Sequence, residues 1–176
     1  MAQREALREL QARLAERLLA AQSTGQAAGW LAVDCAGQGL LFPLAGAGEI
    51  FKLPALLAVP HTRPWFLGVA NLRGRLHGVV DLAAFLGLRG TPGAGAAVPD
   101  AARVLALNPA LGSHCALVVD RLAGLRSAAQ LTAQPPDGQP RPAFAAGCWC
   151  DQTGRVWQEI DLPALAAHPQ FLAIAH

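Results

Sequence analysis

Residues 64–88 read PWFLGVANLRGRLHGVVDLAAFLGL, and they contain the clearest local structure signals of the chain. Two apolar runs flank the polar turn Arg73-Gly74-Arg75, a pattern typical of a β-hairpin. Asp81 follows the second run, and its carboxylate can accept the orphan N–H groups at the start of a helix. Gly87 is the kind of residue that commonly ends one. The stretch therefore predicts a hairpin followed by a short helix at 82–86.

A similar stretch lies about 80 residues further along the chain. Gly74-Arg75 is followed, after five residues, by Asp81-Leu82, and Gly154-Arg155 is followed at the same distance by Asp161-Leu162. A proline, a phenylalanine and a glycine precede each turn. The ordered match predicts two similar β units of about five short strands, each with a helix after its last hairpin. Such units avoid exposed strand edges by closing into small barrels.

Further strands are expected wherever a short apolar run is bounded by turn residues. These runs lie at 30–35, 40–44, 49–53, 103–107, 115–119, 147–150 and 156–160. Residues 89–100 are rich in glycine, alanine and proline and predict a linker. We therefore expect a first subdomain at about 30–88 and a second at about 101–170, within one domain of residues 26–176.

The first 25 residues predict an amphipathic helix. Leu7, Leu10, Leu14 and Leu18 recur at spacings of three and four and form one apolar stripe. Two roles are open for this helix: it packs on the body of the protein, or it is a docking element for a partner.

The composition limits the possible classes of protein. With 53% hydrophobic and 15% charged residues, the chain can bury a core, and it does not look disordered. The net charge of +2, without a Lys/Arg block, does not indicate binding to nucleic acid or to an anionic membrane. The sequence has no apolar run of about 18 residues and no signal-peptide pattern, so we expect a cytoplasmic protein without direct membrane insertion.

The residues that carry chemistry do not form a known catalytic pattern. The sequence contains no G-x-S-x-G, H-E-x-x-H or Walker A motif, and its five histidines are scattered. Cys35, Cys115, Cys148 and Cys150 lack the paired C-x-x-C spacing of a zinc site, and we expect four free thiols. We therefore predict no catalytic residues, no metal and no cofactor.

The hairpin also carries a family resemblance. Residues 68–82 fit the pattern G-V-x-N-L-R-G-x-L-x-x-V-V-D-L, which resembles the signature of the CheW-like domain family. The resemblance extends from about residue 30 to residue 165. The hairpin sequence PWFLGVANLRGRL at 64–76 is most similar to that of the CheW-type adaptors of type IV pilus twitching systems. It implies a fold that is mainly β, with two small five-stranded SH3/OB-like barrel subdomains. It also implies a non-enzymatic scaffold at membrane-associated chemosensory arrays.

The same resemblance implies two partners and a set of contact residues. The partners are the cytoplasmic tip of a methyl-accepting chemotaxis receptor, held in an apolar groove between the subdomains, and the regulatory domain of a CheA-type histidine kinase. The implied contact residues are Ala47, Ile50, Val69, Asn71, Leu72, Arg73, Gly74, Leu117 and Val119. The sequence PLAGAG at 43–48 departs from the bulkier, more polar residues common in the family.

Two of these residues have alternative roles. Arg73 can donate hydrogen bonds to loop carbonyls between the subdomains, contact the receptor, or do both, since its forked guanidinium suits both tasks. Asn71 either caps the turn through its side chain or shapes the groove.

Two other functions are open on sequence grounds. One is a CheW-like adaptor of a flagellar chemotaxis or other chemosensory pathway. The other is a small-barrel nucleic-acid-binding module, which would need basic strands studded with aromatic residues. The chain has no tyrosine, and its four tryptophans are poorly matched with Lys and Arg.

Overall fold

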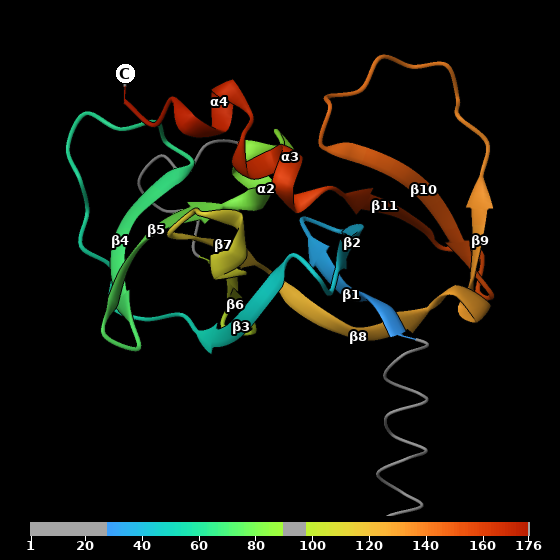
Figure 1. The fold of residues 1–176 in the computed structure, drawn as a ribbon, viewed down its shortest axis with the longest axis horizontal. Helices are drawn as coiled ribbons and strands as arrows, with labels where there is room; N and C mark the ends of the chain where they lie inside the picture. The colour runs from blue at the N-terminus through green and yellow to red at the C-terminus, as the bar shows by residue number, and fades with distance from the viewer. Residues whose placement is uncertain (1–27, 90–97, 176) are drawn as a thin grey trace, which may run out of the picture.

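The computed structural model describes residues 28–89 and 98–175. The helix predicted within residues 1–25 and most of the predicted linker lie outside these residues. The described part is mainly β, as the sequence predicts, with a few short helices (Figure 1). Its strands are β1 (Ala28–Cys35), β2 (Gln38–Pro43), β3 (Ala47–Lys52), β4 (Phe66–Leu72), β5 (Arg75–Asp81), β6 (Arg103–Leu107), β7 (Cys115–Val119), β8 (Arg121–Ser127), β9 (Leu131–Gln134), β10 (Ala145–Asp151) and β11 (Val156–Ile160). Its helices are α2 (Leu82–Phe85), α3 (Leu162–Ala166) and α4 (Pro169–Leu172), with the 3₁₀ turns η1 (Pro109–Leu111) and η2 (Ala128–Gln130).

These strands form two sheets. The six-stranded sheet has the order β8-β1-β2-β11-β10-β9, and the five-stranded sheet has the order β3-β6-β7-β5-β4. Figure 1 shows the five-stranded sheet on the left, the six-stranded sheet on the right, and α2, α3 and α4 above the junction between them. The sequence predicts about five strands for each unit; β8 and β9, for which no apolar run is predicted, both belong to the six-stranded sheet.

Each sheet contains strands from both halves of the chain. Strands β1 and β2 belong to the six-stranded sheet, although they come from the first half, and β6 and β7 belong to the five-stranded sheet. Two parallel pairings make these connections, β11 with β2 and β5 with β7. The sheets therefore differ from the expected division into subdomains at about 30–88 and 101–170.

The two hairpin–helix units have equivalent geometry. Asp81 and Asp161 have φ/ψ of −73°/103° and −73°/102°, and their carboxylates accept from the N–H groups of Ala84 at 3.1 Å and Ala164 at 2.8 Å. Each hairpin turn contains a glycine with positive φ, 79° at Gly74 and 83° at Gly154. Asp81 and Asp161 thus both cap a helix, as the sequence predicts. The first hairpin, β4–β5, belongs to the five-stranded sheet, and the second, β10–β11, belongs to the six-stranded sheet.

The largest apolar cluster, here called the inter-sheet core, lies between the two sheets. It includes Leu31, Val33, Cys35, Leu40, Phe42 and Ile160 from the six-stranded sheet and Val80, Leu105, Leu107, Cys115, Leu117 and Val119 from the five-stranded sheet. Two smaller clusters lie on the other faces, one around Val104 and Val118 and one around Leu41 and Trp157. Strand β7 is therefore buried on both faces, which explains its continuous apolar sequence.

Gly68 in the family pattern has a specific steric role. Its φ is +127°, and a Cβ at this position would lie 2.2 Å from the carbonyl oxygen of Leu57. The close approach allows Leu57 and Val69 to exchange two backbone hydrogen bonds of 2.8 and 2.9 Å. A larger residue here would push the Leu57 segment away from β4.

A network of charged groups also connects the two sheets. The carboxylate of Asp34 on β1, 8% exposed, forms ion pairs with Arg121 and Arg155. Asp120 donates its N–H to the carbonyl oxygen of Asp34 at 2.9 Å, and its carboxylate pairs with Arg89. Because charge-assisted contacts in a partly buried site are strong, this network fixes how the ends of β1 and β7 lie relative to each other.

Candidate functional site

The turn between β4 and β5 is held in a strained but specific conformation. Arg73 has a positive φ of 51°, which is uncommon for a residue with a side chain. The Oδ1 atom of Asn71 accepts the N–H of Gly74 at 2.7 Å. Asn71 therefore has the turn-capping role that the sequence leaves open, and the turn presents Arg73 at the tip of the hairpin.

The guanidinium of Arg73 forms an ion pair with the carboxylate of Glu49 on β3. The side chains of Arg73 and Glu49 are 75% and 44% exposed. The contact that the structure gives Arg73 is therefore an exposed carboxylate within the five-stranded sheet. It is not a set of loop carbonyls between two subdomains, as one of the two sequence-based alternatives requires.

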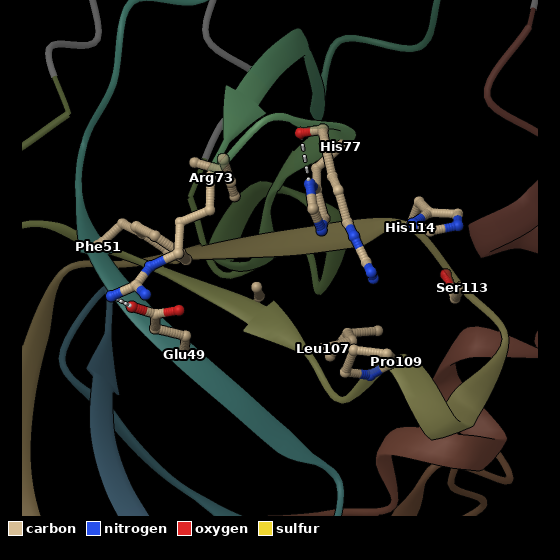
Figure 2. A pocket seen from close by; sticks show the side chains of 11 residues that line it. Glu49, Phe51, Arg73, His77, Leu107, Pro109, Ser113 and His114 are labelled. Atoms are coloured by element: carbon tan, nitrogen blue, oxygen red, sulfur yellow. Dashed lines mark hydrogen bonds and ion pairs between the residues drawn. The ribbon is translucent and has the colours of Figure 1, made fainter.

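A pocket of about 260 Å³ opens beside this ion pair (Figure 2). It is lined by Glu49, Phe51, Leu72, Arg73, Arg75, His77, Ala106, Leu107, Pro109, Ser113 and His114. These residues come from β3, the β4–β5 hairpin, β6, η1 and the loop before β7. Two of the predicted contact residues, Leu72 and Arg73, thus belong to this pocket.

The structure does not bring the other predicted contact residues to one surface. Ala47 and Ile50 lie on β3, at the edge of the inter-sheet core. Val69 lies on β4 and alternates with Ala70, which packs in the smaller cluster of the same sheet. Leu117 and Val119 are 0% exposed within the inter-sheet core, so their side chains present no surface to a partner in this fold.

The exposed edge of the inter-sheet core is a better candidate for an apolar contact surface than the buried residues Leu117 and Val119. Ile50 lies opposite Leu105 in the five-stranded sheet, and Leu125 on β8 lies opposite Leu31 in the six-stranded sheet. Leu105 and Leu31 belong to the inter-sheet core, yet Ile50 and Leu125 are 38% and 55% exposed. Figure 1 shows β3 and β8, the outer strands of their sheets, along the lower side of the molecule.

We call the surface formed by Ala47, Ile50, Leu122 and Leu125 the inter-sheet edge. The sequence analysis predicts no strand at residues 121–127, so it assigns no role to Leu122 or Leu125. Strand β8 lacks an apolar alternation, contains Gly124 with a φ of 91°, and pairs with β1 through two register shifts. The leucines at 122 and 125 were the available signal, but their spacing of three residues does not fit the alternation expected of a strand.

The four cysteines are free, as the sequence predicts. Burial raises the pKa values of the Cys35 and Cys115 thiols to about 12, and both side chains lie in the inter-sheet core. Cys148 and Cys150 are half-buried and share one face of β10. Among residues 28–89 and 98–175, no group of three or more His, Cys, Asp or Glu side chains is arranged to hold a metal ion.

The turn of the second hairpin is also fixed by a side chain. Asp151 accepts hydrogen bonds from the hydroxyl of Thr153 at 2.6 Å and the indole N–H of Trp157 at 2.9 Å. These two donors hold the pKa of Asp151 well below its usual range. The carboxylate thus stays charged at neutral pH and stabilises this turn, as Asn71 does in the first hairpin.

Comparison with known proteins assigns the family. Residues 29–170 match the CheW-like domain, and the chain belongs to that family. It is 30% identical over 166 residues to the protein PilI of Pseudomonas aeruginosa, covering 93% of this chain and 89% of PilI. The structure is similar to that of the scaffolding protein CheW from Thermoanaerobacter tengcongensis, with a TM-score of 0.63 and 19% identity over 77% of this chain and 90% of that one.

The family gives the general function of the chain. CheW-like proteins are non-enzymatic scaffolds, and a CheW-like domain implies binding to chemoreceptors and to a CheA-type kinase in general. None of the helices within the described residues is long and apolar enough to span a bilayer.

Proposed function

We propose that this chain couples methyl-accepting chemoreceptors to a CheA-type histidine kinase in a chemosensory system that controls type IV pilus twitching. The observation that carries this proposal is the similarity to PilI along 93% of the chain, together with the N-L-R-G hairpin tip at 71–74. The place of action is the chemosensory array at the cytoplasmic side of the membrane.

The inter-sheet edge is the proposed contact for the receptor tip. Exposed Ile50 and Leu125 flank a continuous apolar core, and removing such side chains from water favours association. Glu49 and its ion-pair partner Arg73 lie next to Ile50 along the β3 edge, with the Glu49 side chain on the opposite face of the strand. An apolar contact with a charged rim is the usual composition of a specific protein interface.

The first residues of β5 and β11, directly after the two hairpin turns, are the proposed contacts for kinase regulatory domains. Leu76 and Val156 follow the equivalent Gly-Arg turns, and they are 65% and 56% exposed. The resemblance implies that a CheW-like kinase domain packs end to end against such a unit. Two separate surfaces would let the chain bind both partners at once, and linked weak contacts gain effective concentration.

Deletion of the gene in its host tests the pathway. We expect loss of twitching and retention of flagellar swimming, with twitching restored by the wild-type chain. Loss of swimming with normal twitching would assign the chain to a flagellar pathway instead. Binding of single-stranded oligonucleotides at low salt, without binding of receptor or kinase fragments, would favour the nucleic-acid module.

A further inference from the structure

We propose that the pocket beside the β4–β5 hairpin binds a carboxylate side chain of a partner protein, in a segment where an Asp or Glu adjoins a branched aliphatic residue. This assignment goes beyond the receptor and kinase contacts, since it concerns a different face of β3. Phe51 and Glu49 line the pocket, whereas Ile50 between them points to the inter-sheet edge.

The charges around the pocket favour an anion. Its titratable and charged lining groups are Glu49, Arg73, Arg75, His77 and His114. Glu49 is paired with Arg73, so these two groups offset each other. Arg75 forms no ion pair with any residue of the described ranges, which leaves an uncompensated guanidinium at the pocket.

Two imidazoles and a hydroxyl add hydrogen-bonding capacity. His77 is 9% exposed, and its Nδ1 lies 3.0 Å from the carbonyl oxygen of Arg75. Because a carbonyl can only accept, Nδ1 carries the proton, and Nε2 of the neutral ring is an acceptor that can pair with a donor group of the partner segment but not with its carboxylate. The His77 and His114 rings are 5.8 Å apart between centroids, and Figure 2 shows His77 turned into the pocket with Ser113 and His114 on its far side.

The rest of the pocket lining is apolar, which favours an aliphatic group next to the carboxylate of the ligand. Leu72, Ala106 and Leu107 are 4%, 7% and 2% exposed, and Phe51 and Pro109 complete this part. A volume of about 260 Å³ is larger than a carboxylate alone would fill. The pocket therefore fits an acidic group carried by an aliphatic chain, with the carboxylate at Arg75 and the branched end against Leu72 and Leu107.

The test uses a small probe and needs no partner protein. The full chain is titrated with 4-methylpentanoate, and the His Cε1–H NMR signals are followed at constant pH and ionic strength. The signals are assigned with His77→Gln and His114→Gln. We expect both signals to shift saturably, with binding of the uncharged 4-methylpentanamide about tenfold weaker, because a charge-assisted contact to arginine is lost.

Two variants make the result specific. Arg75→Gln should weaken binding of 4-methylpentanoate about tenfold. Lys52→Gln is the matched control, because Lys52 is an exposed cation on β3 that does not line the pocket, and binding should be unchanged. Unmoved histidine signals, equal binding of acid and amide, or equal weakening by both variants would each overturn the proposal. The comparison of acid with amide on the wild-type chain remains decisive if Arg75→Gln does not fold.

Discussion

The guanidinium of Arg73 and the carboxylate of Glu49 join the two outermost strands of the five-stranded sheet. Glu49 lies on β3 and Arg73 follows β4, and these strands stand at opposite ends of the sheet order. Their contact means that the sheet curls until its two edges approach each other. The arginine of the N-L-R-G motif therefore contributes to closing the sheet while its side chain stays largely exposed.

The first prediction concerns Arg73 itself. Arg73→Ala removes an exposed ion pair, so the free energy of unfolding should fall by less than about 1 kcal/mol. Arg73→Gly should be more stable than Arg73→Ala by about 1 kcal/mol, because glycine adopts the positive φ without a steric cost. Both variants should lose binding to a receptor fragment and keep binding to the kinase regulatory domain. Urea denaturation and pull-downs measure these effects, and unchanged receptor binding in both variants would exclude Arg73 from the contact.

The second prediction concerns the inter-sheet edge. Leu125→Glu places a charge on a residue that is 55% exposed, so the fold should persist while receptor binding falls at least about tenfold. Leu172→Glu is the control, because Leu172 is 62% exposed and belongs to α4, a helix on the side opposite β8 in Figure 1. Isothermal titration with a receptor tip fragment measures both. Equal losses in the two variants would show that the effect is not specific to this edge.

The third prediction concerns the order of thiol reactivity. At pH 8, Cys35 and Cys115 remain protonated because burial raises their pKa values to about 12, and the thiolate is the form that reacts. Iodoacetamide should modify Cys148 and Cys150 first, and Cys35 and Cys115 at least about a hundredfold more slowly. Mass spectrometry of peptides at timed intervals gives the order. Four equivalents of label should enter the denatured, non-reduced protein, and fewer would mean that a thiol is blocked.

The fourth prediction compares the two helix caps. Asp161→Ala removes a capping hydrogen bond and should cost about 1 kcal/mol of stability. Asp81→Ala should cost more, about 3 kcal/mol, because Asp81 is 1% exposed and also faces the largely buried Arg89, with 3.5 Å between Arg89 Nε and Asp81 Oδ1. Asparagine at either position should recover part of the loss. Equal costs at the two sites in thermal melts would mean that Arg89 does not depend on Asp81.

Local geometry was the part of the fold most accessible from sequence. Three strands, β6, β7 and β11, begin and end where the apolar runs predict, and both aspartate caps are found. These features depend on neighbours in the chain, such as the carboxylate of Asp161 and the N–H of Ala164. The repeat at a spacing of about 80 residues likewise corresponds to equivalent hairpins.

The pairing of strands that are distant in the sequence could not be predicted from local patterns. Nothing in the apolar runs reveals that β2 pairs with β11 or β5 with β7, because parallel pairing leaves no turn signature in the sequence. The exposure of the predicted contact residues could not be predicted for the same reason. Leu117 is fully buried because β7 lies between β6 and β5, whereas Leu125 is exposed on β8, an outer strand of the other sheet.

The central claim is that receptor and kinase bind this chain at the same time through different surfaces. The most direct measurement is a pull-down on an immobilised receptor tip fragment, with the kinase regulatory domain added with and without this chain. We expect the kinase domain to be retained only when the chain is present, and Leu125→Glu to abolish its retention. Displacement of the chain from the receptor by the kinase domain would contradict the account, because it would mean that the two partners compete for one surface.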